Sequence, residues 1–299
     1  MIEVKELTKR FEEITALDHV NATIREGSVF GLIGTNGAGK STFLKLAAGI
    51  LKPDSGELLL DGDNLFAHPE KKSAFFYISD DQYFFSNVTP LEMLSFYEKL
   101  YPEFDRSRFY HLMKGFSLSP DRKINTFSKG MKKQLSVILG LSARTKYLFC
   151  DETFDGLDPV MRQTVKSLFA NDMAERGLTP VIASHNLREL EDICDHIGLL
   201  HRGGILFSRD LEEMKLNIHR IQCVLKEGQT ADSLSDLDIV LKESRGSLLT
   251  LTVRGTENEV LSKMRGHETI FFELIPLTLE EIFISETEVN GYDIKKLVL

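Results

Sequence analysis

Tryptophan is absent from this chain of 299 residues, and cysteine, long apolar runs and excess positive charge are scarce or missing. The three cysteines, Cys150, Cys194 and Cys223, lack the spacing of metal ligands, so free thiols in a reducing compartment are the simplest expectation. No apolar run approaches the roughly 20 residues of a membrane-spanning helix, and the first residues lack the apolar core of a signal peptide. We therefore expect a cytoplasmic protein whose membrane role, if any, comes through a partner.

The charge balance makes nucleic acid a poor candidate partner. The formal net charge is −9, whereas neutralising phosphate backbones requires a basic surface. The remaining composition, 42% hydrophobic and 27% charged, is ordinary for a globular protein, and the length allows two domains.

The most informative segment is a glycine-rich loop that connects an apolar strand to a helix. The strand is expected over residues 29–33 and the helix begins near Phe43. Between them, the pattern G-x-x-x-x-G-K-[ST] is matched by Gly34, Thr35, Asn36, Gly37, Ala38, Gly39, Lys40, Ser41 and Thr42. Backbone N–H groups of such a loop surround phosphate, Lys40 would reach the β- and γ-phosphates, and Ser41 would bind Mg²⁺. The sequence therefore predicts a nucleoside triphosphate site.

A second apolar strand, expected over residues 147–150, ends in the carboxylates Asp151 and Glu152. At the carboxyl end of a strand beside the P-loop strand, Asp151 can hold Mg²⁺. Glu152 can polarise a water molecule for in-line attack on the γ-phosphorus. An apolar strand that ends in two carboxylates is common by itself. Its position downstream of a P-loop favours a role in the nucleotide site.

The order of strands and helices predicts an α/β fold with two domains. Up to residue 218, strands alternate with helices as in a mainly parallel sheet, and the pattern is helical from Pro90 to about Leu118. After that point, strands separated by polar turns precede a helix, a strand and a helix. We expect a nucleotide-binding domain over 1–218 and a small α+β appendage over 219–299.

Further motifs make the chain similar to one family, the ATP-binding subunits of ATP-binding cassette (ABC) transporters. Residues 127–131, Phe-Ser-Lys-Gly-Met, resemble the signature loop, ordinarily Leu-Ser-Gly-Gly-Gln, with matches at Ser128 and Gly130. Residues 156–158 resemble the D-loop, and His185 the switch histidine that follows a strand. Phe11 resembles the aromatic residue that stacks on adenine. The resemblance covers about residues 1–215.

This resemblance implies a P-loop NTPase cassette with an antiparallel β subdomain and a helical subdomain, using ATP and Mg²⁺. Glu152 would be the catalytic base, and His185 would sense the γ-phosphate. Ser128 and the backbone of Gly130 would contact ATP held by Lys40 of another cassette, so two cassettes would close over two ATP molecules. One set of motifs per chain makes the second cassette a separate polypeptide. A homodimer is favoured because every catalytic element is present, and a related heteropartner stays open.

The family's glutamine that senses Mg²⁺ falls, by spacing, on Asp80. Asp81 and Gln82 compete for that role. Because Mg²⁺ prefers charged oxygen ligands, our hypothesis is that Asp80 contributes to the metal site together with Ser41 and Asp151.

A transport role would require a separate integral membrane subunit, a permease, docking near residues 80–110. Phe84 and Phe85 are candidates for that contact, with a buried core as the alternative. The segment 278–284 is similar to the tail of bacterial export cassettes, so export is favoured over import. The alternatives are a soluble ABC ATPase acting on ribosomes or DNA, or a weakly hydrolysing ATP switch. No second cassette or long coiled coil supports the former, and Glu152 counts against the latter.

Overall fold

The computed structural model describes residues 1–227, 229 and 231–289, and it divides the chain into two compact units, Met1–Ser208 and Arg209–Leu299. This division falls earlier in the chain than the boundary expected after residue 218. Each unit has a hydrophobic core of its own. Among the described residues, no helix has the length and apolar character needed to cross a bilayer.

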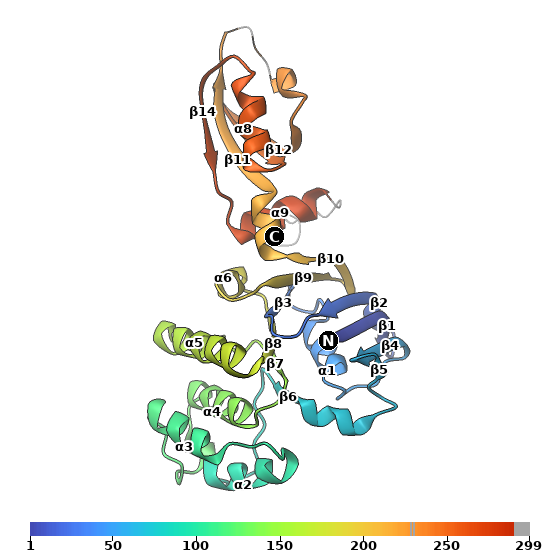
Figure 1. The fold of residues 1–299 in the computed structure, drawn as a ribbon, viewed down its shortest axis with the longest axis vertical. Helices are drawn as coiled ribbons and strands as arrows, with labels where there is room; N and C mark the ends of the chain where they lie inside the picture. Colours follow the sequence, from blue (N-terminus) through green and yellow to red (C-terminus); the bar gives the residue numbers. More distant parts are fainter. Residues whose placement is uncertain (228, 230, 290–299) are drawn as a thin grey trace. The chain divides into compact units, whose positions relative to one another are not determined.

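The first unit is built on a six-stranded sheet in the order β10-β9-β3-β8-β7-β6 (Figure 1). Its strands are β3 (Phe30–Ile33), β6 (Phe75–Ile78), β7 (Tyr147–Asp151), β8 (Thr179–Ser184), β9 (His196–His201) and β10 (Gly204–Asp210). The strands from β9 to β6 run parallel, and every residue of β3, β7 and β8 is buried. Near-continuous apolar strands of this kind are typical of a parallel sheet buried on both faces. The expected α/β fold is confirmed.

A second, antiparallel sheet has the order β2-β1-β4-β5. Its strands are β1 (Ile2–Phe11), β2 (Ile14–Ile24), β4 (Ser55–Leu60) and β5 (Asp63–Asn64). Helix α1 (Lys40–Ala47) contacts strands of both sheets, and its Phe43 and Leu44 lie in their common core. The helix that follows the P-loop is therefore fixed between the two sheets.

The helical part consists of α2 (Pro90–Leu100), α3 (Arg106–Gly115) and α4 (Lys129–Ser142), which contact one another. The helical pattern expected from Pro90 to about Leu118 forms α2 and α3, with a break between the two helices. Pro102 lies in that break, and proline inside a helix removes a hydrogen bond and clashes with the preceding turn. Asp105 then begins α3 as its N-cap by accepting from the Arg108 amide at 2.8 Å.

The remaining helices of the first unit flank the sheet. They are α5 (Pro159–Arg176), α6 (Leu187–Glu191) and two short 3₁₀ segments, η1 (Pro69–Ala74) and η2 (Ile124–Thr126). The Asp158 side chain caps α5, whose Pro159 occupies the first helical position, where a missing N–H costs nothing.

The second unit contains a four-stranded antiparallel sheet in the order β12-β13-β11-β14. Its elements are α7 (Leu211–Leu216), β11 (Ile218–Leu225), η3 (Ala231–Leu234), β12 (Asp238–Arg245), β13 (Leu248–Arg254), α8 (Glu257–Arg265), β14 (Thr269–Ile275) and α9 (Leu279–Val289). Val260 and Met264 of α8 pack in one core with Ile221 and Leu251 of the sheet. This is the α+β appendage expected from the sequence.

Candidate nucleotide-binding and catalytic site

The P-loop borders an open cavity of about 400 Å³ at the carboxyl end of β3. The cavity is lined by residues from the P-loop, the β2 strand, the segment after β6, the end of β7 and the turn between β9 and β10. These residues are Ile14, Thr15, Ala16, Asn36, Gly37, Gly39, Lys40, Ser41, Thr42, Asp80, Glu152, Arg202 and Gly203.

The start of α1 presents free backbone donors to this cavity. Gly39 is the N-cap, has a φ of 106°, and offers no side chain to the first amides of the helix. A Cβ atom at Gly39 would lie 2.4 Å from the carbonyl oxygen of Ala16, so only glycine fits. Unpaired amides and the positive end of the helix dipole together attract an anion.

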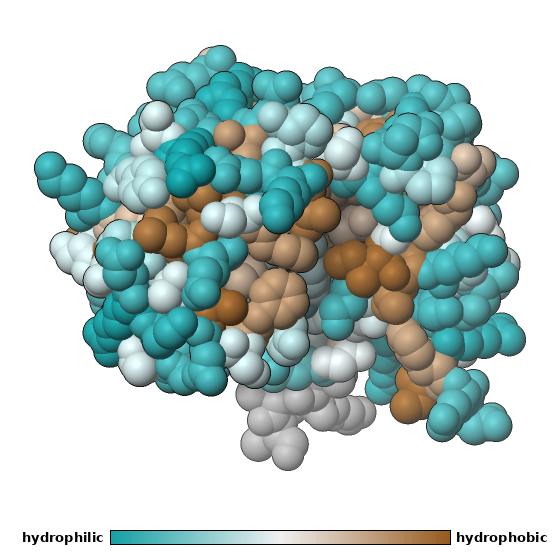
Figure 2. Space-filling view, turned by 90° about the horizontal axis from the view of Figure 1, so that it is seen from below, coloured by the Kyte–Doolittle hydropathy of each residue, from teal (hydrophilic) through white to brown (hydrophobic). Residues whose placement is uncertain are grey.

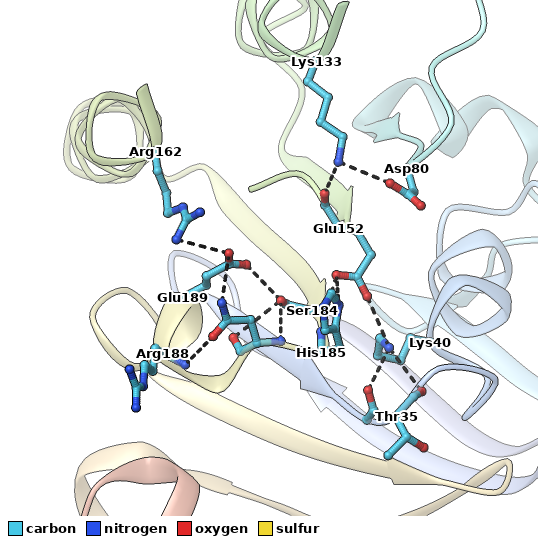
Figure 3. Close-up of polar contacts among 12 residues, drawn as sticks. Thr35, Lys40, Asp80, Lys133, Glu152, Arg162, Ser184, His185, Arg188 and Glu189 are labelled. Atoms are coloured by element: carbon cyan, nitrogen blue, oxygen red, sulfur yellow. Dashed lines mark hydrogen bonds and ion pairs between the residues drawn. The ribbon is translucent and has the colours of Figure 1, made fainter. Parts of the chain in front are cut away.

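Lys40, the first residue of α1, is 6% exposed and folds back over the loop. Its Nζ donates to the carbonyl oxygens of Gly34 at 2.8 Å and Thr35 at 3.3 Å, and it lies 3.3 Å from Glu152 Oε1 (Figure 3). The ammonium is therefore paired within the protein at the place where phosphate groups are expected.

Glu152 follows β7 in a left-handed conformation, with a φ of 46°. Its N–H donates to the Ala183 carbonyl at 3.0 Å, and its own carbonyl accepts from Lys133 Nζ at 2.5 Å. A non-glycine residue holds such a conformation only where its surroundings determine it strongly, often at functional sites. The second carboxylate oxygen, Oε2, lies 2.9 Å from His185 Nδ1. The structure thus brings together Lys40, Glu152 and His185.

Asp151, the last residue of β7, is 2% exposed. Its Oδ2 accepts a hydrogen bond from the Tyr77 hydroxyl at 2.9 Å, and its Oδ1 has no hydrogen-bond partner among the described residues. Burial raises the pKa of Asp151, while the nearby hydroxyls of Ser41 and Tyr77 lower it. A buried carboxylate with an unused oxygen beside the Ser41 hydroxyl is chemically suited to a hard cation.

Within the residues that the structure describes, no group of three or more His, Cys, Asp or Glu side chains could hold a metal alone. Ser41 and Asp151 would therefore supply only part of a coordination shell. Mg²⁺ is commonly bound by one or two protein oxygens with substrate phosphates and water, and these two residues fit that arrangement.

Of the three candidates after β6, only Asp80 lines the cavity. The Gln82 amide turns back on its own loop and donates to the carbonyl oxygens of Ser79 at 2.8 Å and Asp80 at 2.7 Å. Asp81 is exposed. The Asp80 carboxylate lies 3.2 Å from the ammonium of Lys133.

Six of the predicted nucleotide-binding residues do not line the cavity, namely Gly34, Thr35 and Ala38 of the P-loop together with Ser128, Gly130 and Phe11. Ser128 is exposed and caps α4 by accepting from the Met131 amide at 3.2 Å, with Gly130 in the first turn. Phe11 is exposed at the end of β1, where it pairs with Ile14. Ile14, rather than Phe11, borders the cavity in this structure.

His185 is positioned by a buried acid. The Glu189 carboxylate accepts from Ser184 Oγ at 3.0 Å and from the Asn186 side chain at 3.3 Å, and it lies 3.4 Å from Arg162 (Figure 3). Asn186 also caps α6 by accepting from the Arg188 amide at 3.2 Å. These contacts fix the residues on either side of His185 and connect them to α5.

Sequence reasoning missed several residues of the site. Tyr77 and Lys133 contact the two carboxylate residues at the end of β7, and Arg202 lines the cavity from the turn between β9 and β10. One signal for Lys133 was available: the helical spacing of Lys133, Val137 and Leu141 places the lysine on the buried face of α4.

Comparisons with known proteins agree with this geometry. Residues 17–155 match the family model described as ABC transporter. The chain is 32% identical to the ABC transporter ATP-binding protein YtrB of Bacillus subtilis, over 96% of this chain and 98% of that protein. It is 29% identical to the bacitracin transport ATP-binding protein BcrA of Bacillus licheniformis, over 72% of this chain and 71% of that protein. Among solved structures, an ATP-binding subunit of an ABC transporter superposes with a TM-score of 0.67 at 27% identity, covering 72% of this chain and 92% of that one.

Proposed function

This chain belongs to the ATP-binding subunits of ABC transporters and is an ATPase, and we propose that it powers export through a separate membrane-spanning subunit. Two copies would close over two ATP molecules and separate after hydrolysis. The observation that carries this proposal is the cavity in which Lys40, Glu152 and the amino end of α1 converge.

ATP would enter this cavity with its phosphates against the first turn of α1. The phosphates would replace the Glu152 carboxylate as the partner of Lys40, which would release Glu152 toward the attacking water. Ser41 and the unused oxygen of Asp151 would hold Mg²⁺. When bound, Mg²⁺ would neutralise charge on the phosphates.

In the hydrolytic step, Glu152 would accept the proton of the water that attacks the γ-phosphorus. His185 is 2.9 Å from that carboxylate and can orient it or contact the γ-phosphate. The αL backbone of Glu152, fixed through its N–H and its C=O, would keep the base in place.

The signature residues support a site shared between two cassettes. Ser128 is exposed at the start of α4 and does not line the cavity of its own chain. Its hydroxyl proton and the amino end of α4 would therefore be available to phosphates held by a second copy. A homodimer is the simplest assembly because one chain carries both halves.

Mixing two inactive variants tests the shared site. We expect Lys40→Ala to abolish ATP binding, since the ammonium and its charge are lost, and Ser128→Arg to bind ATP but not to hydrolyse it. In a mixed dimer, one site carries both changes and the other is intact, so part of the ATPase activity should return. Lys45→Ala, in the same helix as Lys40, is the matched control and should keep ATP binding. Full activity of Ser128→Arg alone would refute the shared site.

An aromatic cluster supports docking of a permease. Tyr83 is 81% exposed, Phe85 43% and Phe96 39%, and the Phe85 ring packs edge-on against Phe96 at 5.0 Å between centroids. Figure 2 views the molecule from the end where α2 lies and shows hydrophobic patches interrupting a hydrophilic surface. Exposed aromatic side chains in contact with one another are typical of protein–protein interfaces.

The direction of transport rests on the relatives and on the appendage. One relative is named for bacitracin transport. In the second unit, the segment 278–284 is similar to the tail of bacterial export cassettes. Purifying the tagged chain from native membranes should recover an integral membrane subunit and no external binding protein. Phe85→Glu should lose that subunit while retaining ATPase activity, and Tyr110→Glu, an exposed aromatic outside the cluster, should keep it. Recovery of ribosomes or DNA in place of a membrane subunit would contradict the proposal.

A further inference from the structure

Lys133 is a fully buried cation of the site that no motif assigns. Its side chain is 0% exposed, yet its Nζ donates to Asp80 Oδ1 at 3.2 Å and to the Glu152 carbonyl at 2.5 Å (Figure 3). A fully buried ammonium is costly unless it is paired and hydrogen-bonded. The two contacts of Lys133 therefore offset the cost of burying its charge in this state.

The partners of Lys133 differ in their freedom to move. The Glu152 carbonyl belongs to the residue that follows β7, and the N–H of this residue is hydrogen-bonded to the Ala183 carbonyl of β8. This hydrogen bond restrains the backbone of Glu152. The Asp80 carboxylate is 49% exposed and lines the nucleotide cavity. Asp80 can thus turn into the cavity by side-chain rotation, whereas Lys133 and Glu152 stay in contact.

The pair also joins two functional segments. Lys133 belongs to α4, whose N-cap is Ser128, and Asp80 lies a few residues before Tyr83 and Phe85 of the aromatic cluster. A change in the partner of Asp80 would therefore affect both the helix that carries the signature residues and the segment that carries the aromatic cluster.

Resting on the proposed function, we propose that Lys133 and Asp80 form an exchangeable ion pair. Asp80 stays on Lys133 while the metal position beside Ser41 and Asp151 is empty, and it moves toward that position when Mg²⁺ and ATP bind. Lys133 keeps its contact with the Glu152 carbonyl throughout, so it is a positioning residue for the base. Lys133 and the metal then compete for one carboxylate.

Competition of this kind predicts the sign of a measurable effect. Replacing Lys133 by methionine, which has a similar length and no charge, should leave Asp80 free for the metal and strengthen Mg²⁺ binding. An ion pair with one half-exposed partner is worth up to about 1 kcal/mol, so the Mg²⁺ midpoint should fall by up to about fivefold. The loss of the donor to Glu152 should lower kcat separately.

The experiment is a double-mutant cycle read by binding. Fluorescent ATP-analogue binding to the full chain is titrated with Mg²⁺ for wild type, Lys133→Met, Asp80→Asn and the double variant. We expect Lys133→Met to lower the Mg²⁺ midpoint when Asp80 is present and to change it little when it is combined with Asp80→Asn. Lys132→Met, the neighbouring lysine in the same helix, is the matched control and should not shift the midpoint.

A second variant shows whether misfolding of Lys133→Met causes its effects. Lys133→Gln keeps a donor for the Glu152 carbonyl without a charge, so it should shift the Mg²⁺ midpoint like Lys133→Met and retain more of kcat. An unchanged or higher midpoint in both variants would overturn the exchange. Equal shifts with and without Asp80→Asn would also overturn it, because Lys133 would then act only as a distant charge. Wild-type protein without Mg²⁺-dependent ATP binding would instead refute the proposed function.

Discussion

Replacing Glu152 by glutamine should separate ATP binding from hydrolysis. The amide keeps the size of the side chain but cannot accept a proton, and loss of a general base typically costs about 10²–10⁴-fold in rate. We therefore expect turnover to fall by about that factor, measured as phosphate release by the purified protein. Turnover near the wild-type level would refute the role of Glu152 as base.

The structure predicts a second consequence, because Glu152 would compete with phosphate for Lys40. Both side chains are largely buried, at 13% and 6% exposed, and their charged atoms are 3.3 Å apart. The charge-assisted part of such a contact is worth about 1–2 kcal/mol. Removing the charge should therefore tighten ATP binding by about five- to thirtyfold.

ATP binding is best measured without Mg²⁺, so that metal binding does not contribute to the difference. Glu175→Gln, which removes an exposed carboxylate far from the cavity, is the control and should leave the ATP dissociation constant unchanged. If Glu152→Gln weakens ATP binding or leaves it unchanged, the ion pair with Lys40 does not compete with the nucleotide. With Mg²⁺, the variant should also accumulate as an ATP-bound dimer in size-exclusion chromatography.

Three further outcomes follow from particular contacts. Burial raises the pKa of Asp151, so the stability that this group contributes is present below its unfolded pKa and is lost as pH rises through its folded pKa. Asp151→Asn should therefore raise the melting temperature of the nucleotide-free protein at pH 7 by about 2–4 °C. The same change should abolish the extra stabilisation by Mg²⁺ with ATP. Arg202→Ala should weaken ATP binding by about two- to fivefold in an equilibrium titration, since it removes a cation from the cavity wall, whereas Arg25→Ala should not. A chain ending at Ser208 should bind ATP and stay monodisperse, whereas one ending at residue 218 should aggregate, because Leu211 and Met214 would lose the second unit they pack against.

Much of the fold could be predicted because the relevant signals are local. Strand, glycine-rich loop and helix follow one another in sequence, and the second unit has the expected order of strands, helix, strand and helix. The break between α2 and α3 also had a local signal in Pro102, which the spacing of apolar residues outweighed. The spacing of the apolar residues carries no information about the proline, which cannot continue a helix.

The arrangement of the site depended on contacts between distant segments, which a single sequence does not contain. Spacing left Asp80, Asp81 and Gln82 in competition, and only the folded loop shows Gln82 bonded to its own backbone. The helical spacing places Lys133 on the buried face of its helix, but it does not show which groups the ammonium contacts. Its partners, Asp80 and Glu152, lie 53 and 19 residues away along the chain.

The charges of the site lead us to expect that ATP rearranges its ion pairs. Lys40 is paired with Glu152 and Lys133 with Asp80, whereas one oxygen of the Asp151 carboxylate has no partner among the described residues. A triphosphate cannot enter while Glu152 faces it, because like charges in a partly buried cavity repel strongly. We therefore expect Glu152 to leave Lys40 when ATP enters, and a cation at Asp151 to lower the remaining repulsion. In the proposed mechanism, the movement that admits the phosphates would also free Glu152 to act as the base, so nucleotide binding would prepare the site for the hydrolytic step.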